Sequence, residues 1–243
     1  SSIASQTGNV ILVGTGVGVN GASVDDPVGL LIGATSIQTG GGASLAGTGG
    51  DVSAQVAAIA GAATPNTVRF PTYGVLIDTS SVTAGLGRTI SVSGQAGNNG
   101  VSVNGAGVVS TLDARDVQIG FSGAGALNAS GGAVIVNGGT FGVQANGSSI
   151  DVSRTGGTGG SVQIGGVDVG VFQTTITANG TAGGGLIALD ADNVAFVASN
   201  ATLSANATTS GSGGTIRVRA LGSAGPTSAS TARVYGTLSA TGA

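Results

Sequence analysis

Short runs of alternating apolar and polar residues recur along the second half of the chain. One run, Val162–Ile164, follows two glycines, and equivalent runs at Ile187–Leu189 and Ile216–Val218 also follow Gly-Gly pairs. Every second residue of these runs is apolar, which is the period of a β-strand with one buried face. The pattern therefore predicts strands whose apolar residues, such as Val162 and Ile164, point into a core.

Two further apolar runs follow each Gly-Gly strand before the next copy begins. In the last of them, one large apolar residue stands between two hydroxyl residues, at Thr175–Thr177, Thr202–Ser204 and Thr237–Ser239. Corresponding residues of successive copies are 25 to 35 residues apart. Such a repeat, with three short strands, predicts a β-solenoid, because a single coil cannot bury its apolar face without neighbours.

The same pattern runs less regularly through the first half of the chain, and no linker divides it. We therefore predict one all-β domain over residues 1–243, with three short strands per coil. A mean repeat of about 27 residues predicts about nine coils. Two stretches interrupt the repeat, near 53–73 and 221–230, and their Gly and Pro residues predict insertions at the corners of coils.

Gly and Asn residues separate the predicted strands. Gly accounts for 49 of the 243 residues, and it permits the positive φ values that sharp corners require. Asn adopts such conformations as well, and its side chains can stack into hydrogen-bonded ladders between coils. The candidate positions for such ladders are Asn104, Asn137, Asn146, Asn179 and Asn206.

Two groups of residues are candidates for binding. The first insertion carries Arg69, Phe70 and Tyr73, which form either a recognition loop, as insertions on a repeat array often do, or a segment packed against the solenoid. The second group is a ladder of hydroxyl residues on the third strand of each repeat, suited to ice or glycan binding, although Thr also simply suits an exposed strand. This hydroxyl ladder consists of Thr175, Thr177, Thr202, Ser204, Thr237 and Ser239.

The amino-acid composition argues against several classes of function. All ten acidic residues are Asp and all seven basic residues are Arg, and the chain has no His, Cys, Lys or Glu. The usual general bases and activated nucleophiles are therefore missing, so we predict a protein that is not an enzyme and needs no metal or cofactor. The net charge of −3 predicts no nucleic-acid partner, and no apolar run approaches the roughly 18 residues of a membrane helix.

A carbohydrate-active parallel β-helix enzyme is the alternative that composition leaves open. Glycoside hydrolysis uses two carboxylates held at a fixed separation on one face of the protein. The closely spaced pairs in this chain are Asp25 with Asp26, Asp113 with Asp116, and Asp190 with Asp192.

The segments Gly184–Ala195, Gly213–Arg219 and Ala232–Gly242 resemble repeats of large two-partner-secreted exoproteins of the filamentous haemagglutinin type. The resemblance extends over about 125–243 and concerns repeats, not an active site. It implies a right-handed parallel β-helix and export across a Gram-negative outer membrane by a secretion partner. It also implies adhesion, aggregation or biofilm formation. The Asn-Pro-Asn-Gly type motif of the family's N-terminal secretion domain is absent, so the chain resembles an internal or C-terminal piece.

We therefore expect a non-enzymatic structural or adhesive solenoid that is secreted or displayed on the surface of a Gram-negative bacterium. An ice-binding solenoid is the second alternative. No polar cap is recognisable before Val10 or after Thr237–Ser239, and open strand edges pair readily with other strands. The expected partners are therefore further coils, in an end-to-end filament or a longer solenoid, and glycans of host surfaces or matrix.

Overall fold

The computed structural model of the chain describes residues 1–15, 30–48, 75–95, 102–105, 108–111, 117–122, 126–138, 142–222 and 230–243. All regular elements within these ranges are β-strands. Among them no helix is long and apolar enough to cross a membrane. The first predicted insertion, with Arg69, Phe70 and Tyr73, lies outside the described residues, as does 223–229 of the second.

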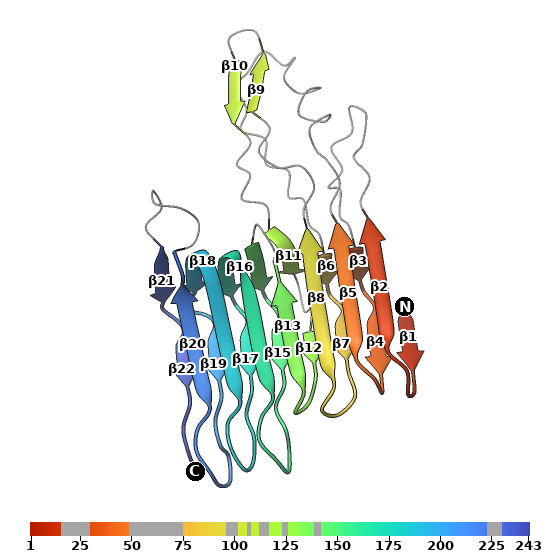
Figure 1. Cartoon of the computed structure of the whole chain (residues 1–243), viewed down its shortest axis with the longest axis vertical. Coiled ribbons are helices and arrows are strands. Elements are labelled where there is room, and N and C mark those ends of the chain that lie inside the picture. Colours follow the sequence, from red (N-terminus) through yellow and green to blue (C-terminus); the bar gives the residue numbers. More distant parts are fainter. Residues whose placement is uncertain are drawn as a thin grey trace.

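Eight parallel strands form one sheet, which we call the third face (Figure 1). Neighbouring strands of this sheet come from successive turns of the chain around the stack. In stacking order it contains β1 (Ser2–Ser5), β4 (Ser36–Thr39), β7 (Ser81–Thr83), β12 (Ala126–Asn128), β15 (Ser149–Asp151), β17 (Thr175–Thr177), β19 (Thr202–Ser204) and β22 (Thr237–Ser239).

A twelve-stranded sheet forms the other two faces. Two of its strands, β16 (Ser161–Phe172) and β18 (Leu186–Val197), are long enough to contribute to both. The first face also contains β2 (Val10–Thr15), β5 (Ala43–Thr48), β8 (Thr89–Gln95), β13 (Ala133–Asn137) and β20 (Thr215–Ala220). The second face also contains β3 (Leu30–Gly33), β6 (Val75–Asp78), β11 (Val117–Ser122), β14 (Gly142–Asn146) and β21 (Thr231–Val234).

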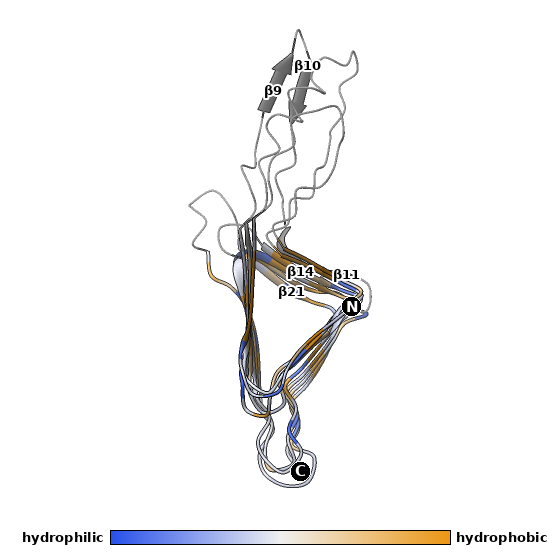
Figure 2. Cartoon of the chain, turned by 90° about the vertical axis from the view of Figure 1, so that its right-hand side faces the viewer, coloured by the Kyte–Doolittle hydropathy of each residue, from blue (hydrophilic) through white to orange (hydrophobic). Residues whose placement is uncertain are grey.

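The chain visits the three faces in turn, as in β2, β3 and β4 and then β5, β6 and β7. Figure 2 shows the resulting triangular outline along the stack. This is the arrangement of a β-solenoid, with the three strands per coil that the sequence predicts. Apart from the stack, β9 (Ser102–Gly105) and β10 (Val108–Thr111) pair antiparallel as a separate two-stranded sheet. The expected number of coils, about nine, stays a prediction.

One detail of the predicted strands is wrong. The sequence predicts that a separate strand follows each Gly-Gly strand, whereas β16 continues without a break from Val162–Ile164 through the next apolar run, Val167–Val171. The chain passes the corner by a shift of register relative to β18 between Gly166 and Asp168. A local irregularity of this kind bends a strand without ending it, so no loop is needed at this corner.

The predicted register between copies is confirmed. Ile187 pairs with Val162 on one side and with Ile216 on the other, and Leu203 pairs with both Ile176 and Leu238. The side chains of Val162, Ile176, Ile187 and Leu203 are completely buried. Each buried Ile or Leu side chain contributes about 1.5–3 kcal/mol, so the core is a continuous column that every coil extends.

The Gly-Gly pairs that precede the first-face strands are required by close packing of neighbouring coils. A Cβ atom at Gly185 would overlap the carbonyl oxygen of Gly160, and one at Gly214 would overlap the carbonyl oxygen of Gly185. Neither Gly185 nor Gly214 has a positive φ, so the conformational freedom that we expected glycine to supply is not the role of these two residues. That freedom is used at other corners, as at Gly147 with φ +65°.

Buried hydroxyl groups stabilise the corner between the second and third faces. The residue before the hydroxyl has a left-handed backbone, as at Gln173 with φ 47°. Thr174 Oγ1 then donates to the carbonyl oxygen of Phe172 at 2.8 Å and lies 3.2 Å from Ser148 Oγ of the preceding coil. Both hydroxyl residues are buried, so the bonds satisfy polar groups that water cannot reach.

We predict that Ile187→Asp unfolds the solenoid, because an unpaired carboxylate would lie in an apolar core between two neighbouring coils. The expected loss of stability is at least about 4 kcal/mol. The control is Thr202→Asn, on the partly exposed outer side of β19, which should change stability by less than about 1 kcal/mol. Thermal melts followed by circular dichroism measure both, and equal melting temperatures would contradict the register.

Candidate functional site

The structure brings the predicted hydroxyl ladder together on the third face. Strand pairing aligns Thr175, Thr202 and Thr237 in one line across β17, β19 and β22, which we call the first column. The same pairing aligns a second column, which consists of Thr177, Ser204 and Ser239. The two columns flank the buried line of Ile176 and Leu203.

Hydroxyls of the second column are bonded within the protein. Ser204 Oγ donates to Asn179 Oδ1 at 2.8 Å, and Ser239 Oγ donates to Asn206 Oδ1 at 2.9 Å. The backbone N–H of Asn206 donates to the same Asn179 oxygen at 2.7 Å. Each side-chain carbonyl thus joins its own coil to the next. Asn179 and Asn206 therefore form hydrogen bonds between coils, as predicted, but these bonds go to backbone N–H groups and Ser hydroxyls and not from one Asn side chain to another.

Asp151 continues the second column one coil earlier, since it pairs with Thr177. Its Oδ1 accepts a hydrogen bond from Thr177 Oγ1 at 2.6 Å and another from the backbone N–H of Ser153 at 2.9 Å. Partial burial raises the pKa of this carboxyl, but the bonds from Thr177 and Ser153 outweigh it and hold the pKa below its ordinary value of 3.8. The hydroxyls of the second column therefore donate to neighbouring side chains of the protein, and few of them are free to bind a ligand.

The first column differs, because its hydroxyls have no hydrogen-bond partner within the described part of the chain. Register extends the column beyond the predicted residues, since Thr175 pairs with Ser149 on β15. On the next strand, Ala126 interrupts the line between Ser149 and Ser81. Thr175, Thr202 and Thr237 therefore form a short row of donors and acceptors that face solvent at the spacing of strands, about 4.7–4.9 Å.

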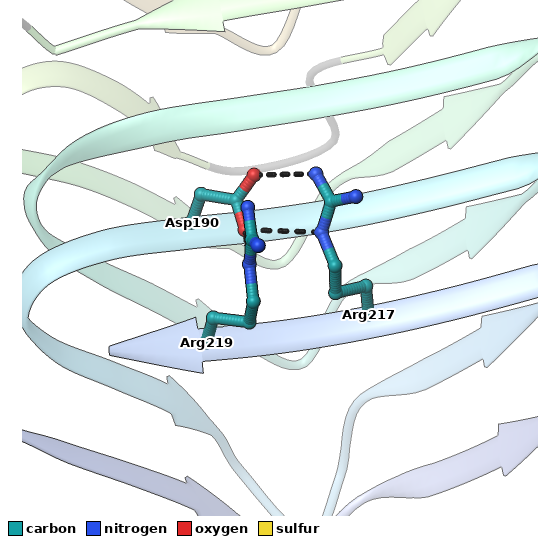
Figure 3. Close-up of polar contacts among 3 residues, drawn as sticks. All are labelled: Asp190, Arg217 and Arg219. Carbon is teal, nitrogen blue, oxygen red and sulfur yellow. Dashed lines mark hydrogen bonds and ion pairs between the residues drawn. The ribbon is translucent and has the colours of Figure 1, made fainter. Parts of the chain in front are cut away.

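A charged cluster lies on the first face, where Arg217 and Arg219 of β20 both contact Asp190 of β18 (Figure 3). Arg219 Nε lies 2.8 Å from Asp190 Oδ1, and Arg217 Nη2 lies 2.7 Å from Oδ2. The hydrogen bonds from Arg219 and Arg217 lower the pKa of Asp190 from 3.8 to about 2. We call these three residues the acid–arginine clamp, and it joins two adjacent coils.

This geometry bears on the enzyme alternative. A general acid in glycoside hydrolysis needs a raised pKa, whereas Asp190 stays ionised near neutral pH. Its candidate partner Asp192 lies on the same strand, and the remaining candidate carboxylates, at Asp25, Asp26, Asp113 and Asp116, lie outside the described residues. Within the described ranges, no group of three or more acidic, His or Cys residues is placed to hold a metal ion.

A row of aromatic rings crosses the second face, and the sequence analysis missed it. The ring of Phe196 stacks on Phe172 with centroids 5.3 Å apart and lies 5.8 Å from the ring of Tyr235. Phe172 and Phe196 are partly buried, whereas Tyr235 is 64% exposed. The rings come from three successive coils but not from paired positions, since Phe196 pairs with Gly170 and with Arg233. A comparison of aligned repeats therefore gives no signal for this row.

No protein family, curated protein or solved structure matches the chain. The likeness to filamentous haemagglutinin therefore stays a resemblance between repeats. The functional argument depends on the surfaces of the solenoid, namely the first column, the acid–arginine clamp and the row of aromatic rings.

We predict that acid weakens the contact between β18 and β20. Because the pKa of Asp190 is lower in the folded chain, its ionised form stabilises the fold above about pH 4, and this contribution is lost as the pH falls through about 2. The melting temperature of Asp190→Asn should therefore fall less between pH 6 and pH 2 than that of the unmodified chain. Asp192→Asn, a change on the same strand, is the control and should retain the full acid sensitivity. Equal acid sensitivity of Asp190→Asn and the unmodified chain would contradict the prediction.

Proposed function

We propose that the chain is part of a secreted, non-enzymatic β-solenoid that acts as a structural or adhesive shaft on the surface of a Gram-negative bacterium. The observation that carries the proposal is the repetition of the same contacts from coil to coil. Gly160, Gly185 and Gly214 pack alike, and Asn179 and Asn206 bond alike. A structure with such contacts gains length by adding coils, without a new design at each step.

The direction of the backbone hydrogen bonds suits this role. Neighbouring strands on all three faces are parallel, so their hydrogen bonds run along the stack. We propose a right-handed path with about nine coils, since connections between parallel strands of one sheet are right-handed in nearly all proteins. The resemblance to haemagglutinin-type repeats supports export through an outer-membrane partner.

Further coils and glycans are the proposed partners. On the outermost strands of the third face, Ile3 is 39% exposed and Leu238 is 41% exposed, although their counterparts in inner strands are fully buried. Coils of a longer chain, or of a second copy, would cover these side chains. Glycans of a host surface or matrix would contact the outward faces.

Surface display tests the proposal. The chain, fused to an outer-membrane anchor on a non-adherent bacterium, should raise the number of cells that adhere to glass and to cultured animal cells at least tenfold. The control is display of the Ile187→Asp chain at the same density. Release of reducing sugar ends from polysaccharides by the purified chain would favour the enzyme alternative, and adhesion equal to that of the control would contradict the proposal.

Ice binding is a second candidate, favoured by the hydroxyls of Thr175, Thr202 and Thr237, which have no hydrogen-bond partner among the residues that the structure describes. A regular row of hydroxyls can order water, and hydroxyls bonded within the protein cannot do so as freely. If this function holds, the purified chain should lower the freezing point without lowering the melting point, and Thr202→Asn should reduce the difference by at least half. A nanolitre osmometer measures this difference, and freezing at the melting point would contradict ice binding.

A further inference from the structure

The row of rings on the second face has the form of a binding surface. We call Phe172, Phe196, Tyr235 and Arg233 the aromatic platform. Its rings come from β16, from β18 and from the residue after β21, so the platform extends along the stack and not along a strand. The rings of Phe172 and Phe196 are inclined by 30°, and those of Phe196 and Tyr235 by 53°. Aromatic side chains on an outward face of a soluble protein often mark a site of interaction.

The backbone beneath the platform accommodates the rings. Gly170 pairs with Phe196, and a Cβ at Gly170 would lie 2.6 Å from the ring of Phe172. The ring of Phe172 therefore lies over a residue that has no side chain. Because the two rings stack on each other across adjacent coils, both are partly buried, whereas the ring of Tyr235 is mostly exposed.

Polar groups surround the rings. Arg233 pairs with Phe196 between the inward Ala232 and Val234 positions, so it lies on the same side as the rings, and within the described chain it forms no ion pair. Beyond the other end of the platform, Gln144 pairs with Gly170, and Asn146 pairs with Phe172. The surface thus combines π faces with one guanidinium and two amides.

This combination favours a saccharide partner. The C–H groups of a sugar ring pack on an aromatic face, while its hydroxyls bond to polar groups at the edge. A guanidinium binds a carboxylate through two parallel hydrogen bonds, so Arg233 favours a sugar acid over a neutral sugar. Asp168 lies on the same face two residues before Gly170, but its Oδ1 already accepts bonds from Asn193 and Val194.

We propose that the aromatic platform binds a linear acidic polysaccharide that lies along the stack, with sugar rings on Phe196 and Tyr235 and a carboxylate on Arg233. The proposal rests on the adhesive function proposed above and names the chemistry of the partner. The net charge of −3 opposes unspecific attraction of a polyanion. Binding therefore depends on local contacts of the platform.

Isothermal titration calorimetry of the purified chain tests the proposal, with polygalacturonate as the acidic probe and amylose as the neutral one. The unmodified chain should bind polygalacturonate saturably and at least tenfold more tightly than amylose. Tyr235→Ala should weaken binding of polygalacturonate at least fivefold. Because Tyr235 is mostly exposed, the variant should fold, and its circular dichroism melt verifies this.

Two further variants separate the contributions. Arg233→Gln should reduce the preference for polygalacturonate over amylose, whereas Gln163→Ala, an exposed change on the first face, should leave both affinities unchanged. Absence of saturable polygalacturonate binding, equal affinity for both probes, or unchanged binding by Tyr235→Ala would each overturn the proposal. This solution measurement is independent of surface display, so adhesion without polygalacturonate binding would reject the platform and retain the proposed function.

Discussion

Fixed register between successive coils is the constraint on which the rest of the structure depends. A coil of three short strands has almost no interior of its own, so Ile187 is buried only because Val162 and Ile216 pair with it on either side. The same pairing decides which residues meet on the outside. A slip of one residue would exchange the core and the surface throughout, and the close approach of the Gly-Gly pairs leaves little freedom for such a slip.

Each outward surface follows from that register in its own way. Direct pairing gives columns of like residues on the third face, as with Thr175, Thr202 and Thr237. Offset positions give the aromatic row of the second face. The acid–arginine clamp combines direct pairing with an offset contact, since Arg219 pairs directly with Asp190 and Arg217 lies two residues earlier on the same strand as Arg219. One scaffold therefore presents three chemically different surfaces without any change in its core.

The regular part of the fold could be predicted from the sequence, because the Gly-Gly pairs and the alternation at Val162, Ile187 and Ile216 set the period and the register together. The sequence could not predict that β16 continues through its corner, since Gly165 and Gly166 suggest a turn as readily as a bend. The hydroxyl columns could be predicted because their members pair directly. The sequence could not predict which hydroxyls are bonded within the protein, because that depends on side-chain bonds to Asn179 and Asn206.

The corner between the first and second faces has a consequence for how such a chain can change over time. In β16 and β18 the backbone crosses this corner without interruption, whereas Thr48 and Val75, which end β5 and begin β6, are separated by 26 residues of sequence. The strands on both sides keep parallel pairing with their neighbours all the same. The corner thus accepts extra sequence without disturbing the stack, and new loops can be acquired there while the solenoid itself is preserved.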